Sequence, residues 1–234
     1  MKKIGLQDYL AKRQLHESAK PQYRNLCVAC MNPEFSCYCA TIEKFDPGVQ
    51  FVILIHPIEF QRRIATGRMS HLILQNSHLI RGQNFTNHSR VNSLIEDKKN
   101  HCVILYPSRT SINLSETKPE HQRSLFPKDK KVTVFVIDGT WATARQMMRQ
   151  SENLQNLQRV CFTPLARSNF RVRKQPEEHC LSTIEAIHQF IDIASDHISF
   201  DRESRKHDIL MKVFDTMVER QISFVEAYDR PSAW

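Results

Sequence analysis

The segment Val132–Ile137 (Val-Thr-Val-Phe-Val-Ile) runs directly into Asp138-Gly-Thr-Trp141, and these ten residues decide the fold. The first six are β-branched or aromatic and do not alternate with charged residues, which is typical of a strand buried on both faces of a parallel sheet. Apolar residues at helical spacing follow over Trp141–Ser151. A buried strand that passes through a polar turn into a helix is the building unit of an α/β fold.

The rest of the chain repeats this alternation. Three further segments have the same apolar character and are predicted strands: Gln50–Ile55, His101–Tyr106 and Arg159–Phe162. Helical spacing predicts further helices over Phe60–Asn76, Asn92–Lys98, Thr183–Ala194 and Asp208–Tyr228. Ser182 and Glu185 have the spacing of a capping box. The sequence therefore predicts an α/β fold, a mostly parallel sheet with helices on both faces, and polar connections over 107–131 and 163–180.

The composition is that of a soluble globular protein. Of 234 residues, 41% are hydrophobic and 25% charged, so disorder as the main state is excluded. The longest uncharged apolar runs have five or six residues, whereas a membrane helix needs about 20. The N-terminus lacks the apolar core of a secretory signal. We therefore expect a cytoplasmic protein without membrane contact, as a monomer or homodimer.

The net charge of +8 favours phosphate-rich partners, because Lys and Arg displace counterions from nucleic acid. Part of this charge lies in Asn153–Pro176, which has no acidic residue. Its basic residues are Arg159, Arg167, Arg171, Arg173 and Lys174. The segment is either a solvated loop or a phosphate-binding surface. Along the chain we expect a polar lead (1–24), a cysteine knuckle (25–45), an α/β domain (46–200) and a C-terminal helical extension (201–234).

Four of the seven cysteines fall within 13 residues in the pattern C-x2-C-x6-C-x-C: Cys27, Cys30, Cys37 and Cys39. Thiolates at this spacing can converge on one ion, and zinc accepts four of them tetrahedrally in a structural site. An iron–sulfur cluster is the main competitor. Disulfides or unrelated buried thiols are the remaining alternative, although a reducing cytoplasm disfavours disulfides. The other cysteines are scattered and are expected to be core thiols.

Three predicted strands end in short polar motifs: His56-Pro-Ile-Glu59, Pro107-Ser108 and Asp138-Gly-Thr-Trp141. Ligands collect at the carboxyl ends of strands in open parallel sheets, so the three turns predict one shared site. Each turn also has a purely structural interpretation, since proline ends strands, Asp138 or Thr140 could cap a helix, and Trp141 could pack in the core. Glycine-rich phosphate loops, a serine nucleophile elbow and the H-E-x-x-H motif are absent, which argues against dinucleotide, P-loop and zinc-protease chemistry.

The motif Asp138-Gly-Thr-Trp141, followed by Ala144, resembles the D-x-T-W signature of the DTW-domain family, the tRNA-uridine aminocarboxypropyltransferases. Other landmarks of that family occur in order: the four-cysteine knuckle, His56-Pro57 with Glu59, Thr66-Gly67, Pro107-Ser108 and Ser182–Ala186. The resemblance extends from about Cys27 to about Ala194. It implies kinship with SPOUT-type RNA methyltransferases, and hence a parallel sheet with a C-terminal trefoil knot that holds S-adenosylmethionine.

The resemblance also implies an activity, which is transfer of the 3-amino-3-carboxypropyl group of S-adenosylmethionine to N3 of a tRNA uridine. Asp138 is the candidate general base, with Thr140 and Trp141 beside it; Asp138 could instead hold the amino group of the donor or orient Thr140. Trp141 is a candidate to stack on a base. The expected donor pocket comprises Pro107, Ser108, Leu181, Ser182 and Thr183. The expected substrate contacts are His56, Glu59, Thr66, Arg171 and Arg173.

Two other functions fit the same sequence. A SPOUT-type methyltransferase would use the same donor but transfer its methyl group. A non-catalytic zinc-containing RNA-binding protein would bind tRNA with an affinity that falls with salt and would release no methylthioadenosine.

Overall fold

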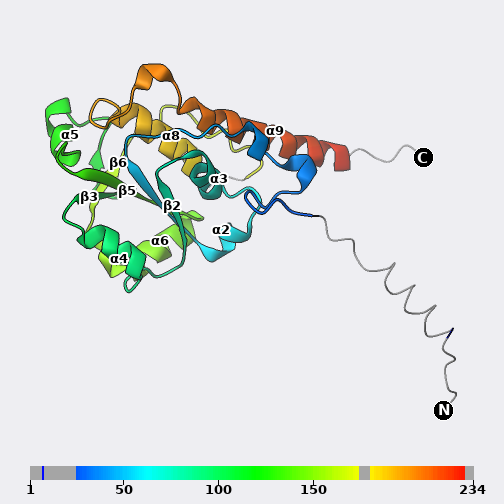
Figure 1. The fold of residues 1–234 in the computed structure, drawn as a ribbon, viewed down its shortest axis with the longest axis horizontal. Coiled ribbons are helices and arrows are strands. Elements are labelled where there is room, and N and C mark those ends of the chain that lie inside the picture. The colour runs from blue at the N-terminus through cyan, green and yellow to red at the C-terminus, as the bar shows by residue number, and fades with distance from the viewer. Residues whose placement is uncertain (1–6, 8–24, 174–179, 230–234) are drawn as a thin grey trace, which may run out of the picture.

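The computed structural model describes residues 25–173 and 180–229, together with Gln7 (Figure 1). Within these ranges the chain forms a sheet between two layers of helices. The rest of the predicted lead over 1–24, and the end of the predicted basic segment from Lys174 onward, lie outside the described residues.

The described residues form one sheet of six parallel strands in the order β2-β1-β5-β3-β6-β4. The strands are β1 Gln50–Ile55, β2 Ser77–Arg81, β3 Asn100–Leu105, β4 Ile112–Asn113, β5 Lys131–Asp138 and β6 Gln158–Cys161. β5 lies between β1 and β3, and its last residue, Asp138, is opposite Ile55 at the end of β1. The polar turn after β5 therefore starts from the middle of the sheet.

The four predicted strands are confirmed as β1, β3, β5 and β6, with bounds that differ by at most one residue. β2 and β4 were not predicted. β2 lies at one edge of the sheet and reads Ser-His-Leu-Ile-Arg, without a buried residue. β4 lies at the other edge and has only two residues. Edge strands lack the unbroken apolar pattern because one side of the strand has no neighbour.

Within residues 25–173 and 180–229, the helices of more than three residues are α2 Pro57–Gln61, α3 Thr66–Ile73, α4 Ser89–Glu96, α5 Pro119–Leu125, α6 Trp141–Gln150, α7 Glu152–Gln155, α8 Thr183–Ala194 and α9 Asp208–Asp229. The same ranges contain three short 3-10 helices, η1 Glu34–Ser36, η2 Cys39–Thr41 and η3 Arg202–Ser204. The predictions that correspond to α4, α6, α8 and α9 are confirmed, as is the capping box of α8. The connection 107–131 is not merely polar, because it contains β4 and α5.

The prediction of a single helix over Phe60–Asn76 is wrong. The backbone turns extended at Arg62, so α2 ends there and α3 starts at Thr66. The Arg68 guanidinium donates to the backbone carbonyls of Phe60 and Arg62, at 3.0 Å for the second. These carbonyls would otherwise accept intrahelical bonds, so the buried arginine stabilises the break.

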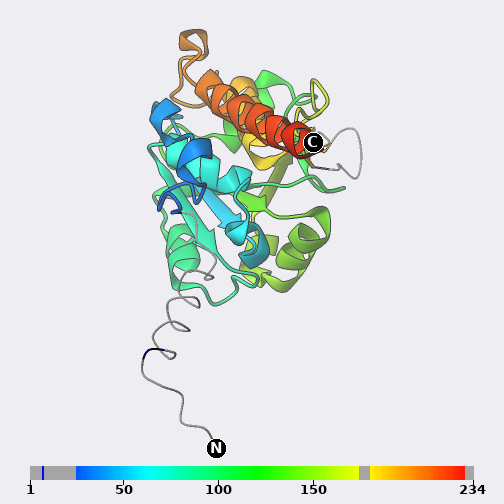
Figure 2. The same cartoon turned by 90° about the vertical axis from the view of Figure 1, so that its right-hand side faces the viewer.

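The helices cover both faces of the sheet, as predicted. Figure 2 shows the red helix α9 on one side and the green helices α4 and α6 on the other. Alternate residues of β1 separate into the two cores: Phe51 and Ile53 pack with α3, α8 and α9, whereas Val52 and Leu54 pack with α4 and α6. A continuously apolar strand is thus explained by burial on both faces.

None of the helices in the described part of the chain combines the length and the apolar character needed to cross a bilayer.

Candidate active site and metal centre

A cavity of about 790 Å³ opens at the carboxyl ends of β3, β5 and β6. Its walls come from the turns after these strands, from the start of α6 and from the start of α8. Its volume is within the range of about 300–1,000 Å³ that small-molecule sites occupy. The parallel topology therefore places the cavity where ligands bind in open α/β sheets.

Asp138 lines this cavity and is 4% exposed. Its carboxylate accepts two hydrogen bonds, from the Thr183 hydroxyl at 2.6 Å and from the Gly67 amide at 3.2 Å. Burial raises the pKa of Asp138 to about 6, and the nearby Glu59 adds to that rise, while the two donors and Arg173 oppose it. A carboxyl group with this pKa is ionised at neutral pH and still able to take up a proton.

The close approach of α3 to Asp138 requires a glycine at position 67. A Cβ atom at this position would overlap the Asp138 carboxyl group. Glycine therefore allows the first turn of α3 to approach closely enough for its amide to bond the carboxylate. The amino-terminal end of a helix carries partial positive charge, which favours the ionised form of the acid.

Thr140 and Trp141 form the next part of the cavity wall. Thr140 caps α6 by accepting a hydrogen bond from the Thr143 amide at 3.2 Å. Trp141 is the first residue of α6 and is half-buried. The capping interpretation of Thr140 is thus confirmed, and capping leaves the residue in the cavity wall.

A second buried carboxylate holds the start of α8 in place. Glu185 accepts hydrogen bonds from the Ser182 amide at 2.8 Å and from the Ser182 hydroxyl at 2.5 Å. It also accepts bonds of 2.7 Å from the Ser168 hydroxyl and the Asn169 amide. The bonds from Ser168 and Asn169 join the loop after β6 to the same helix whose Thr183 contacts Asp138.

Glu59 and Arg173 link the end of β1 to the cavity. Glu59 is 3% exposed and forms ion pairs with Arg62 and Arg173, each at 3.2 Å. Arg173 lines the cavity, whereas Glu59 and His56 do not. His56 caps α2 by accepting a bond from the Ile58 amide at 3.3 Å.

The four cysteines of the predicted knuckle converge. Their Sγ atoms all lie within 4.8 Å of one another, with Cys27 and Cys39 at 3.7 Å and Cys30 and Cys37 at 3.6 Å. Backbone amides of Cys30 and Ala29 lower the pKa of the Cys27 thiol to about 6, whereas burial raises the pKa of the Cys39 thiol. Four thiols in this arrangement fit a tetrahedral metal ion.

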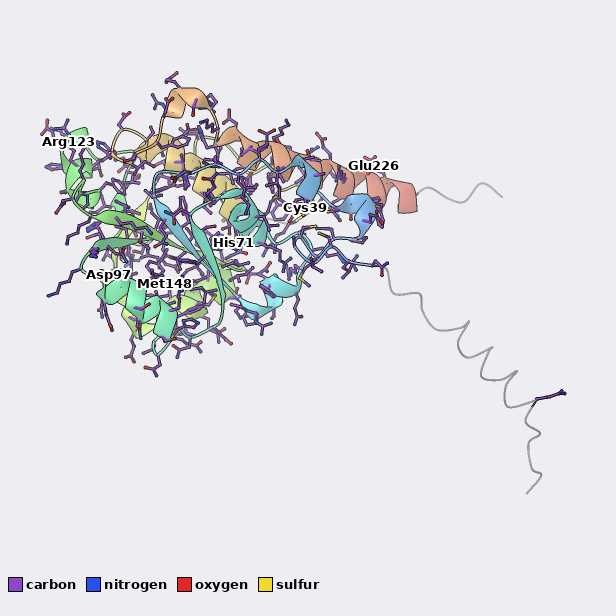
Figure 3. The ribbon with its side chains drawn as sticks, in the orientation of Figure 1. Cys39, His71, Asp97, Arg123, Met148 and Glu226 are labelled. Carbon is purple, nitrogen blue, oxygen red and sulfur yellow. The ribbon has the colours of Figure 1, made fainter. Side chains whose placement is uncertain are left out.

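The knuckle is built into the domain. Cys30 and Tyr38 are buried in the same core as α3, α8 and α9. Arg220 of α9 donates to the Cys37 carbonyl at 2.9 Å, and Figure 3 shows Cys39 beside that helix. On its other side, the Asn32 side chain donates to the Arg63 carbonyl at 3.3 Å. The knuckle therefore contacts the turn that leads to Gly67.

The DTW domain matches residues 24–222. The chain belongs to the DTW-domain family. A Drosophila melanogaster protein named tRNA-uridine aminocarboxypropyltransferase 2 is 31% identical over 180 residues, which are 74% of this chain and 68% of the fly protein. Proteins of the same name from Macaca fascicularis and Mus musculus are each 25% identical, over 68% and 73% of this chain. The matches span about half the length of those two relatives (53% and 55%). No solved structure matches the chain.

Most of the predicted site residues of this DTW domain lie together. The cavity is lined by the following members of the predicted set: Asp138, Thr140, Trp141, Pro107, Leu181, Ser182, Thr183, Thr66 and Arg173. Ser108 does not line it, because its hydroxyl bonds those of Ser111 at 2.8 Å and Thr110 at 3.2 Å. Arg171 is exposed outside the cavity.

Other lining residues of the DTW site were not predicted. They include Tyr106, Arg145, Phe162 and Phe170. Tyr106 and Phe162 stood at the ends of predicted strands, where the strand-end rule could have included them. Arg145 follows Trp141 by one helical turn, so the helical spacing of α6 was the available signal.

Proposed function

We propose that this DTW protein transfers the 3-amino-3-carboxypropyl group of S-adenosylmethionine to N3 of a uridine in tRNA and releases methylthioadenosine. The names of the matched relatives support this activity. The proposal depends most on one observation: Asp138 is a buried carboxyl group with a raised pKa, and it lines the cavity. Uridine N3 holds a proton and becomes a good nucleophile only after losing it, so the reaction needs such a base.

The cavity suits both ends of the donor. Leu105, Val136 and Leu181 give it apolar walls on which an adenine ring can pack. Arg173 supplies a guanidinium for the donor carboxylate. The sulfonium activates all three carbons attached to it, so the outcome depends on which carbon the walls hold in line with N3.

In the proposed step, Asp138 accepts the N3 proton. N3 forms a bond to the propyl carbon attached to sulfur, and the carbon–sulfur electron pair returns to sulfur. The charge of the sulfonium is neutralised in the thioether product, and the proton stays on the carboxyl group. Thr183 and Gly67 hold the carboxylate by their hydrogen bonds. Trp141 lines the cavity and would stack on the uracil.

The four cysteines fit zinc, which would supply structural cross-linking rather than chemistry. Metal analysis of untagged protein should find about one zinc per chain and no iron. Iron with acid-labile sulfide would instead identify a cluster, and the absence of any metal would overturn the zinc site.

We further propose that the domain is related to SPOUT methyltransferases and forms a trefoil knot around the donor loops. Part of the approach to α8, residues 174–179, lies outside the described residues. A crystal structure with bound donor would show whether the chain passes through a loop there.

The activity is tested with tRNA and donor labelled separately in the methyl and the carboxypropyl groups. We expect carboxypropyl label in the RNA and methylthioadenosine in solution. Methyl label alone in the RNA would identify a methyltransferase. If neither label enters RNA that the protein binds, the protein is a non-catalytic binder of RNA.

A further inference from the structure

Helix α6 carries a line of side chains that leads out of the cavity. Trp141 and Arg145 both line the cavity, and Arg149 follows one turn later. Residues four apart on a helix share a face, so these three side chains form a row along α6. Arg145 and Arg149 are exposed. The row therefore continues the cavity onto the surface.

Arg159 of β6 pairs with Ile104 of β3, and Ile104 packs in the same core as α6, so Arg159 belongs to the face of the sheet that α6 covers. Tyr106, at the end of β3, lines the cavity next to α6. Burial raises the pKa of the Tyr106 hydroxyl, and the nearby positive charges of Arg145 and Arg159 oppose that rise. Helix α6 and strand β6 thus each bring an arginine close to Tyr106 in the cavity wall.

These arginines have no carboxylate partner among the described residues. By contrast, Arg62, Arg173 and Arg205, which also belong to the described residues, each form an ion pair with an acidic side chain. Arg145 and Arg149 instead present like charges one turn apart, an arrangement that destabilises a helix slightly. Arg145 and Arg149 are therefore exposed and available to bind an anion.

We infer that Arg145, Arg149 and Arg159 bind the RNA phosphates that flank the target uridine. Guanidinium groups pair well with phosphate, and aromatic side chains take up unstacked bases. The aromatic residues lie in the cavity and the arginines extend beyond it, which matches a single strand whose one base enters while its backbone stays outside. A free nucleotide or the donor carboxylate inside the cavity would contact only one of these three arginines, Arg145, because the other two do not line the cavity. This inference rests on the proposed function, because it assigns the RNA-facing side of the same site.

The test measures tRNA binding without turnover, as a function of salt, for Arg149→Ala and Arg159→Ala. Each lost phosphate contact lowers the salt slope by about one and weakens binding at low salt by about tenfold. Arg149→Lys, which keeps the charge, should retain most of the slope. Donor affinity, measured separately by calorimetry, should stay unchanged in both alanine variants.

Arg123→Ala is the matched control. Arg123 is an exposed arginine on α5, at the far end of the molecule from the knuckle (Figure 3), and lines a separate hollow of about 510 Å³. Its removal should leave tRNA affinity and slope unchanged. The inference is overturned if the α6 and β6 variants bind like wild type, if Arg123→Ala weakens binding equally, or if donor affinity falls instead. Because no turnover is needed, these outcomes are separate from a failure of group transfer.

Discussion

Asp138 and Glu185 are two buried carboxylates that contact the first turn of α8, but their surroundings differ. Glu185 accepts four hydrogen bonds, from Ser182, Ser168 and Asn169. Asp138 accepts two and faces the cavity. A buried carboxylate is costly when it accepts few hydrogen bonds, because its charge is then poorly compensated. The carboxylate with fewer donors, Asp138, is therefore the one that can more readily take up a proton. The difference supports the proposed role of Asp138 in proton transfer and a structural role for Glu185.

The largest expected effect is the loss of turnover in Asp138→Asn. An amide of the same shape cannot take the N3 proton, so the rate of transfer should fall by about 10²- to 10⁴-fold. Single-turnover transfer with labelled donor measures the rate, and circular dichroism checks the fold. A folded variant that keeps near-normal turnover would leave Asp138 with a positioning role only.

The same variant should also change how stability depends on pH. Burial raises the pKa of Asp138 from 3.8 to about 6, so the folded state binds this proton more tightly than the unfolded state. Its contribution to stability is fully present below about pH 3.8 and is lost as the pH rises through about 6. The shift of roughly two units corresponds to about 3 kcal/mol.

Asparagine does not ionise in this range. The free energy of unfolding of Asp138→Asn, relative to wild type, should therefore rise by up to about 3 kcal/mol from acid to neutral pH. Denaturant titrations at a series of pH values measure this difference. A difference that does not change with pH would show that the carboxyl group is not destabilised by burial.

Glu185→Gln should act on stability in the opposite direction. A glutamine places an N–H group where one of the four donors points, and hydrogen bonds to a charged group contribute about 1.5–3 kcal/mol. We expect the free energy of unfolding at neutral pH to fall by about 2–3 kcal/mol. Glu226→Gln, at an exposed glutamate of α9 labelled in Figure 3, is the control and should stay near wild type. Equal stability of both variants would contradict the structural role.

The central strands could be predicted because burial on both faces leaves an unbroken apolar pattern in β1, β3 and β5. The edge strand β2 has no such pattern, since its residues are half-buried or exposed. The break between α2 and α3 was missed because it depends on Arg68, whose guanidinium contacts appear only after folding.

The candidate site likewise has features that the local sequence predicts and contacts that it does not. Asp138 was found because it directly follows an apolar strand, and Glu185 because its capping spacing is local. The other two bonds that Glu185 accepts come from Ser168 and Asn169, which lie 17 and 16 positions away. The approach of Gly67 to Asp138 spans 71 positions. Contacts of this length depend on how α3 and α8 pack, which no local spacing specifies.

Thr183→Val should have the smallest effect and tests the hydrogen bonds of Asp138 directly. The Thr183 hydroxyl donates to the carboxylate at 2.6 Å and lowers its pKa. Without that bond the pKa rises above about 6, so the acid limb of the kcat/KM profile should move up by about one pH unit. Below its midpoint, activity falls about tenfold per pH unit as the base becomes protonated. Thr183→Ser keeps the hydroxyl and should restore the wild-type midpoint, and an unmoved midpoint in Thr183→Val would mean that the titrating group is not Asp138.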